Sequence, residues 1–250
     1  MARELIARRE TEAFSIRLLG AFGVARAGDR LELPGGFPSK AVRIVAARGG
    51  RVHHEELIEW VWPEVGPRLG RNRLRNLVSR LRVSVGDLLV RQDEMVMLSP
   101  GCELDSERFE TSAQEALRLF ASGDRRQAAI IARATLERYR GDLLPDDAYE
   151  EWSQAPRDRL RAYRLELLDL LAEAAERDGE TDEAIRLLTR AVEAGPCDES
   201  RYLRLAGLLA SQGRVGSALV TLDRGEAALA AARVASSPEL ERMRRRLRPV

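Results

Sequence analysis

Lysine, histidine and cysteine are scarce in this 250-residue sequence. Lys40 is the only lysine among 41 basic residues, and His53 and His54 are the only histidines. The two histidines are adjacent, and neighbouring positions on a helix cannot converge on one metal ion. The sequence therefore predicts neither a histidine metal site nor a histidine-based catalytic centre.

The two cysteines, Cys102 and Cys197, lie far apart and lack the spacing of metal ligands. We expect both to be reduced, structural thiols. No G-x-S-x-G nucleophile motif and no G-x-x-x-x-G-K-[ST] phosphate loop occurs in the sequence. The predictions are therefore no enzyme activity, no cofactor and no metal.

Long apolar runs are also missing. The stretch MARELIARRETEAF (1–14) contains no apolar core of the length that a signal peptide needs. No other stretch approaches the ~18 apolar residues of a membrane span. We therefore expect a cytoplasmic protein without a membrane partner.

Net charge is nearly balanced, at +1, so no global field draws the chain to nucleic acid. Residues 14–105 hold 14 basic against 11 acidic side chains, and residues 106–250 hold 24 against 26. This modest asymmetry indicates the first part as the nucleic-acid side. Arginine is frequent throughout the chain, so the number of arginines in any one segment is weak support by itself.

The first part alternates short strand-like runs with helices. The runs that read as strands are FSIRLLGAFGVA (14–25), GDRLEL (28–33), LLVRQ (88–92) and EMVMLSP (94–100). Helices are expected at 39–48 with Ser39 as N-cap, at 53–62 before Pro63, and at 68–85 before Gly86. The order predicts an α+β winged helix-turn-helix over residues 14–105, with Trp62 in its core.

From Asp105 onward the helical period dominates. Three segments place an alanine five residues after a glycine, namely GDRRQAA (123–129), GETDEAI (179–185) and GRVGSAL (213–219). The last two glycines are 34 residues apart, the period of the tetratricopeptide helix-turn-helix repeat. We therefore expect an all-α tetratricopeptide-like domain over residues 106–250.

The segment GRNRLRNLVSRLR (70–82) carries the most specific chemistry. On a helical wheel, Leu74, Leu77, Val78 and Leu81 form one apolar stripe, and Asn72, Asn76, Ser79 and Val83 lie opposite it. Arginines flank this crest, and no acidic residue occurs from Val65 through Gly86. Asparagine can read adenine edges, and arginine can bind guanine or phosphate, so this helix is predicted to enter a DNA groove.

Other charged segments favour an ordinary solvated surface. Arg157, Arg159, Arg161 and Arg164 alternate with acids, which indicates a salt-bridged outer helix face. The acidic pairs at 146–147 and 150–151 are interpreted as a solvated loop and helix start. The basic tail at 242–248 is interpreted as a solvated helix end.

In order and in motif, LLGAFGVARAGDRLELPGG, GGRVHHEELIEWVWPE, GRNRLRNLVSRLR and RGDLLPDDAYEEW resemble the Streptomyces antibiotic regulatory protein family. That family joins an OmpR-type winged helix to a bacterial transcriptional activator domain. The resemblance implies a sequence-specific regulator, usually an activator, that binds promoter direct repeats and contacts RNA polymerase. We add the expectation of a homodimer on double-stranded DNA. The predicted DNA-binding residues are Lys40, Arg71, Asn72, Arg73, Arg75, Asn76, Ser79, Arg80, Arg82 and Arg91.

The sequence departs from that family pattern in two places. Gly101-Cys102 stands where the fold usually carries Gly-Tyr after the wing. Thirteen residues precede the first predicted strand, too few for a phosphoacceptor receiver domain. An alternative interpretation is a tetratricopeptide-like scaffold whose winged helix no longer reads DNA, because such repeats present surfaces to peptides and partner helices.

Overall fold

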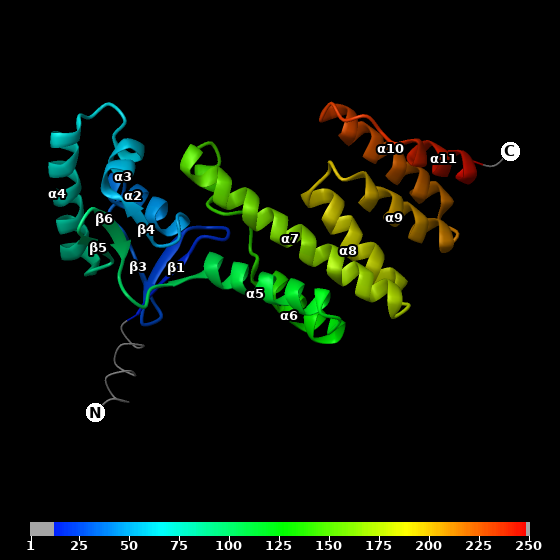
Figure 1. Ribbon diagram of the computed structural model, residues 1–250, viewed down its shortest axis with the longest axis horizontal. Helices are drawn as coiled ribbons and strands as arrows, with labels where there is room; N and C mark the ends of the chain where they lie inside the picture. The colour runs from blue at the N-terminus through cyan, green and yellow to red at the C-terminus, as the bar shows by residue number, and fades with distance from the viewer. Residues whose placement is uncertain (1–12, 249–250) are drawn as a thin grey trace. The chain divides into compact units, whose positions relative to one another are not determined.

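A computed structural model describes residues 13–248 (Figure 1). The N-terminal stretch without signal-peptide character falls almost entirely outside the described residues. The described chain divides into two compact units. The first runs up to Thr111 and also includes Glu137–Leu160, and the second comprises Ser112–Leu136 and the chain from Arg161 onward. The predicted fold class, a winged helix followed by tetratricopeptide-like helices, is confirmed.

A small sheet opens the first unit. Its strands are β1 (Phe14–Arg17), β2 (Gly23–Arg26), β3 (Asp29–Leu31) and β7 (Glu103–Leu104), in the order β3-β2-β1-β7. The strand expected over residues 14–25 is wrong as one element, because the chain turns between β1 and β2 through Gly20 at φ 85°. β7 was not predicted, since two residues that pair in parallel with β1 carry no local pattern.

Three helices follow, α2 (Phe37–Ala47), α3 (His54–Val61) and α4 (Pro67–Val85). Ser39 is not the N-cap of α2: the helix begins two residues earlier, after Gly36, because Pro38 suits the first turn. The second helix is shorter than predicted, and His53 caps it by accepting a hydrogen bond from the Glu55 amide. Trp62 is 7% exposed, which confirms its place in the core.

The wing belongs to a second sheet, β4 (Arg51–His53), β5 (Leu89–Gln92) and β6 (Met95–Leu98), in the order β4-β6-β5. The β5–β6 hairpin was predicted, whereas β4 was assigned in part to a helix and in part to no element. Three residues of mixed polarity cannot announce a strand, and β4 exists because it pairs with β6, more than 40 residues away.

Helices make up the rest of the chain. They are α5 (Asp105–Ala121), α6 (Arg125–Arg138), η1 (Pro145–Asp147), α7 (Glu151–Arg177), α8 (Thr181–Ala194), α9 (Glu199–Ser211), α10 (Val215–Ala231) and α11 (Pro238–Leu247). The repeat pattern is confirmed. Gly123, Gly179 and Gly213 turn the chain at φ 94°, 74° and 75° between successive helices. The alanine five residues after each glycine is fully buried.

Residues 137–160 pack with the winged helix, although they follow α5 and most of α6 in sequence. The Gly20 amide donates to the Asp142 carbonyl at 3.0 Å, and the Leu144 amide donates to the Leu18 carbonyl at 2.9 Å. The compact units are therefore divided differently from the sequence segments 14–105 and 106–250. The division of the sequence into domains at residues 105 and 106 stays a prediction.

Two charged segments differ from their predicted solvated state. Arg157 is 4% exposed, and its guanidinium donates to the carbonyls of Leu143, Leu144 and Ala148 at 2.9–3.0 Å. Asp147 is 8% exposed and bonds Arg43 at 2.7 Å. The interpretations are wrong for Arg157 and Asp147, because the partners of these two side chains are backbone or distant residues that local charge alternation does not reveal.

The basic tail also differs from its predicted solvated state. The Arg244 side chain is only 11% exposed, and Asp223, Glu226 and Glu241 surround it. This part of the interpretation was wrong because α10 lies beside α11 and supplies two of those carboxylates.

Candidate nucleic-acid interface

Helix α4 has well-defined ends. Pro67 occupies its first turn, where a missing amide hydrogen costs nothing, and Gly86 ends it at φ 89°, which favours glycine. Its buried side carries Gly70, Leu74, Leu77, Leu81 and Val85. The predicted apolar stripe is therefore confirmed at Leu74, Leu77 and Leu81, and Val78 is half-buried at its margin.

The opposite side of α4 is exposed along its whole length. Asn72, Asn76, Ser79 and Val83 all face solvent, and Val83 is 87% exposed. The structure therefore brings the predicted crest together on one face. Short amides, a hydroxyl and a branched apolar group supply both hydrogen-bonding and methyl-contacting chemistry for base edges.

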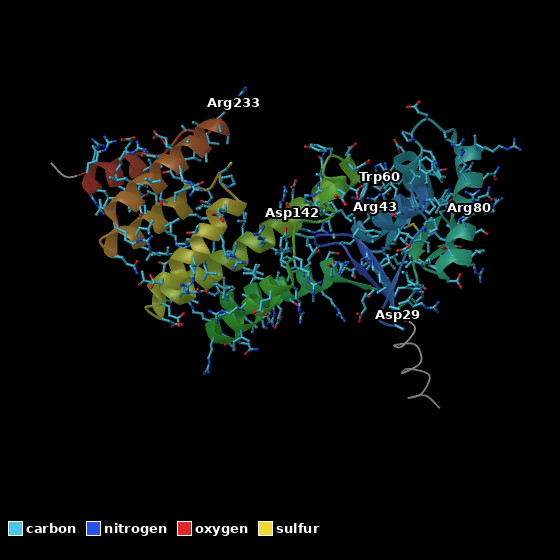
Figure 2. All side chains as sticks on the ribbon, turned by 180° about the vertical axis from the view of Figure 1, so that it is seen from behind. Asp29, Arg43, Trp60, Arg80, Asp142 and Arg233 are labelled. Atoms are coloured by element: carbon cyan, nitrogen blue, oxygen red, sulfur yellow. The ribbon has the colours of Figure 1, made fainter. Side chains whose placement is uncertain are left out.

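The arginines of α4 differ in their partners. Arg71 bonds Glu55 of α3 at 3.2 Å, Arg82 bonds Asp87 at 2.8 Å, and Arg75 contacts the Asn72 amide oxygen at 3.5 Å. These contacts are exposed, so they are weak and exchangeable. Within residues 13–248, neither Arg73 nor Arg80 has an acidic partner, so both guanidinium groups are available to an external anion. Figure 2 labels Arg80 on α4, and it labels Arg43 of α2 between Arg80 and Asp142.

The wing carries charge of both signs. Arg91 is exposed on β5, two residues before the turn formed by Asp93 and Glu94. Asp93 adopts φ 52°. The Glu94 carboxylate lies 3.2 Å from Nε2 of His53. Because the tip is acidic, a phosphate would meet Arg91 on the strand rather than at the turn.

Lys40 is occupied. Its ammonium group lies 3.0 Å and 3.1 Å from the two carboxylate oxygens of Glu150. Although burial acts to raise the pKa of Glu150, hydrogen bonds from Lys40 and Trp152, with the charges of Lys40 and Arg43, lower it below its usual value. A phosphate contact by Lys40 would require Glu150 to be displaced.

Burial raises the pKa of two groups where the sheet meets α5, Asp105 and Cys102. Burial raises the pKa of Asp105, but its carboxylate accepts hydrogen bonds from the Leu18 and Leu19 amides at 2.7 Å and 3.1 Å. Burial, with smaller effects from Glu107 and Glu103, raises the pKa of Cys102 to about 12. Cys102 therefore stays a protonated thiol at neutral pH, and neither cysteine forms a disulfide in the described chain.

Clusters of metal-ligating side chains and membrane-spanning helices are both absent from the described residues. From 13 to 248, no group of three or more histidine, cysteine or acidic side chains could hold a metal ion. In the same residues, no helix combines the length and apolarity that crossing a membrane requires.

Sequence reasoning missed a groove beside α4. Phe37, at the first position of α2, lines it together with the buried Trp62 and with Arg73, Asn76 and Arg80 of α4. The available signal was an aromatic residue directly before a proline at a helix start, but its position beside α4 is a tertiary fact.

A family model described as the bacterial transcriptional activator domain matches residues 104–248. The match covers more than half of the chain, and it extends over the helical repeats and the segment that packs with the winged helix. The chain belongs to the bacterial transcriptional activator domain family. Its resemblance to the Streptomyces antibiotic regulatory proteins is confirmed, and this family is a class of transcription regulators rather than of enzymes.

One solved structure is similar to this protein over both the winged helix and the activator domain. Mycobacterium tuberculosis EmbR, solved with a low-affinity phosphopeptide, is similar over 95% of this chain, with a TM-score of 0.73 and 23% identity. The chain spans 66% of the length of that EmbR chain. The likeness shows a shared fold. The search of curated proteins found no match.

Two other solved structures match parts of the chain at TM-scores below 0.5. The C-terminal tetratricopeptide-containing domain of a Plasmodium falciparum FK506-binding protein is 10% identical over 57% of this chain and 87% of its own, with a TM-score of 0.41. The Yersinia enterocolitica type III secretion translocator chaperone is 15% identical over 57% of this chain and 86% of its own, with a TM-score of 0.34.

Proposed function

We propose that this regulator binds promoter DNA in a sequence-specific manner by placing α4 in the major groove. The observation that carries the proposal is the exposed face of α4, which is free of acids, rich in arginine and asparagine, and mounted on a winged helix. A helix of this kind, with its side chains, is about 10–12 Å across, and the major groove of B-DNA is about 12 Å wide.

Roles within the interface follow from position on the helix. Asn72, Asn76 and Ser79 lie on the crest and are proposed to meet base edges. Arg73, Arg80 and Arg75 lie on the shoulders and are proposed to bind phosphates or guanines, as are Arg71 and Arg82 after exchange of their weak carboxylate partners. Arg91 and Lys40 are proposed as backbone contacts, with Lys40 the weakest because Glu150 already holds it.

Activation is proposed to follow from contact between the bound protein and RNA polymerase. We also propose that two copies bind neighbouring direct repeats in the cytoplasm, since one winged helix reads only a short half-site. Membership in a family of transcription regulators supports the contact with RNA polymerase and the cytoplasmic location. The short half-site that a single α4 can read supports the binding of two copies.

Measurement of DNA affinity against salt concentration tests the proposal. The wild-type chain selects its own duplex from random sequences, and Asn76→Ala and Arg80→Gln are then compared on that duplex. If Arg80 binds a phosphate, Arg80→Gln lowers the slope of log affinity against log salt by about one unit. Loss of the Asn76 base contact weakens binding by ~1–3 kcal/mol and relaxes preference at one base position.

Arg118→Gln is the matched control. Arg118 is an exposed arginine of α5, outside α4, and its partner is Glu115, three positions earlier in the same helix. We expect its affinity and salt slope to equal those of the wild type. Failure of the wild type to select any duplex, or equal behaviour of all three variants, would contradict the reading role of α4.

The scaffold alternative makes the opposite prediction. A protein that only presents its helical repeats to partners would bind every DNA fragment weakly and without preference. The burial of Leu74, Leu77 and Leu81 in the winged helix, with the opposite face of α4 left exposed, favours the DNA reader.

A further inference from the structure

A groove of about 350 Å³ lies between the start of α2 and the middle of α4. Its lining residues are Phe37, Pro38, Trp62, Arg73, Asn76, Leu77 and Arg80. Trp62 and Leu77 are buried and form an apolar floor. The rings of Phe37 and Trp62 lie 5.4 Å apart, yet Phe37 remains 52% exposed beside the floor.

The wall that α4 contributes is cationic and polar. Arg73, Asn76 and Arg80 are all exposed, and no carboxylate in the described chain pairs with either arginine. A groove with an apolar floor and a cationic wall fits an occupant that alternates apolar and anionic groups. A DNA strand has this composition, because deoxyribose rings alternate with phosphates along it.

The position of the groove fits the same occupant. When a helix about 10–12 Å wide fills a groove about 12 Å wide, its shoulders lie against the two phosphodiester strands. Arg73 and Arg80 form one shoulder of α4, next to the crest at Asn76. Docking the crest on base edges therefore brings one strand over the mouth of this groove.

We propose that this groove holds one sugar–phosphate strand of the bound duplex, and that Phe37 contacts DNA. The exposed Phe37 ring packs against a deoxyribose, while Arg73 and Arg80 bind the phosphates on either side of that sugar. This inference rests on the proposed function and adds to it a contact from α2, outside the recognition helix.

Affinity against salt separates the Phe37 contact from the arginine contacts. Phe37→Ala removes an apolar contact. Because the Phe37 ring carries no charge and neutralises no phosphate, binding to the selected duplex is expected to fall by about tenfold while the salt slope stays at the wild-type value. Ile130→Ala is the control, because Ile130 on α6 is also 52% exposed. Wild-type affinity in Phe37→Ala would overturn the inference.

A second measurement guards against loss of packing between Phe37 and Trp62. Replacement of Phe37 by the photoreactive p-benzoylphenylalanine keeps an aromatic ring in place, and illumination is expected to crosslink the protein to one strand of the duplex. The same substitution at Ile130 is expected to give no crosslink. Crosslinking at 37 that is no stronger than at 130 overturns the inference, even if Phe37→Ala weakens binding.

These outcomes are distinct from failure of the proposed function. If the wild type selects no duplex, then DNA binding itself is refuted. If the wild type binds and Arg80→Gln lowers the salt slope while position 37 gives neither effect, only the role of this groove and of Phe37 is refuted.

Discussion

Helix α4 approaches α3 closely at Gly70. A Cβ atom at this position would lie 2.4 Å from Cγ2 of Ile58, whose side chain is buried. The Ile58 methyl group is on a branched carbon and cannot move away without a change of rotamer. The close packing of α4 on α3 therefore depends on the absence of a side chain at residue 70.

Substitution of Gly70 by alanine is expected to destabilise the fold. Overpacking against Ile58 costs ~1–3 kcal/mol, and alanine regains up to ~1 kcal/mol in helix propensity, so the net loss is about 1–2 kcal/mol. Urea unfolding measures this as a lower midpoint. Gly35→Ala is the control, because a Cβ there meets no atom within 4 Å and the midpoint should not fall. Equal midpoints for the two variants would contradict the close approach.

At the scale of elements, glycine turns set the helix pairs of the repeats. The segment GRVGSAL contains Gly213 at φ 75° and Gly216, which has no positive φ, and a Cβ at either position meets nothing within 4 Å. The two glycines therefore differ in backbone conformation and not in available space. Gly213 therefore tests the positive φ of glycine in the turn, and Gly216 tests glycine at the start of α10.

We expect Gly213→Ala to lower the free energy of unfolding by about 1 kcal/mol, because the left-handed conformation disfavours a Cβ. Gly216→Ala should be neutral or raise it by ~0.4–1 kcal/mol, since alanine restricts the unfolded chain and favours the helix. Thermal unfolding of both variants gives the comparison. A larger loss in Gly216→Ala than in Gly213→Ala would refute this account of the turns.

A second element, the segment from 137 to 160, is held to α2 by charge. Lys40 and Glu150 are 110 residues apart in sequence and form an ion pair, next to the pair of Arg43 and Asp147. Burial raises the pKa of Asp147 in spite of Arg43, whereas the partners of Glu150 lower its pKa. Glu150 is therefore the carboxylate whose ionised form favours the folded state.

Glu150→Gln is expected to lower stability at pH 7 by roughly 0.5–1 kcal/mol, a modest value because the side chain is 39% exposed and screened by solvent. A lowered folded pKa stabilises above the unfolded value of 4.5, and this contribution is lost as pH falls through the folded value. The difference between wild type and Glu150→Gln should therefore vanish in acid. Lys40→Met should be non-additive with Glu150→Gln in a double-mutant cycle, and additivity would show that the pair does not couple.

At the scale of the whole molecule, the two copies proposed to bind direct repeats would touch only if they lie on one face of the duplex. B-DNA turns once in about 10–10.5 base pairs, so the repeats must be separated by whole turns. Insertion of about 5 base pairs between them rotates one copy by half a turn. The insertion is expected to abolish cooperative binding while leaving the affinity for each isolated half-site unchanged.

Footprinting on the two spacings provides the measurement. An insertion of about 10 base pairs is the control, because it restores the face but lengthens the separation. Cooperativity that survives the half-turn insertion would show that the copies bind independently of one another or through a flexible connection.

Local pattern determined much of this protein. The helical period placed Leu74, Leu77 and Leu81 inward and Asn72, Asn76 and Ser79 outward on α4, and glycine with alanine at fixed spacing marked each helix pair of the repeats. These features follow from the 3.6-residue period and from the backbone freedom of glycine, which act over a few residues. The positions of the predicted DNA-binding residues on α4 are of this kind.

Only the tertiary structure decided which distant groups meet. It paired β4 with β6 and β1 with β7, turned Arg157 inward onto backbone carbonyls, and placed Glu150 on Lys40. It also set the exposed ring of Phe37 beside Arg73 and Arg80 of α4. Short strands and single ion pairs owe their stability to partners remote in sequence, so no local pattern of residues could announce them.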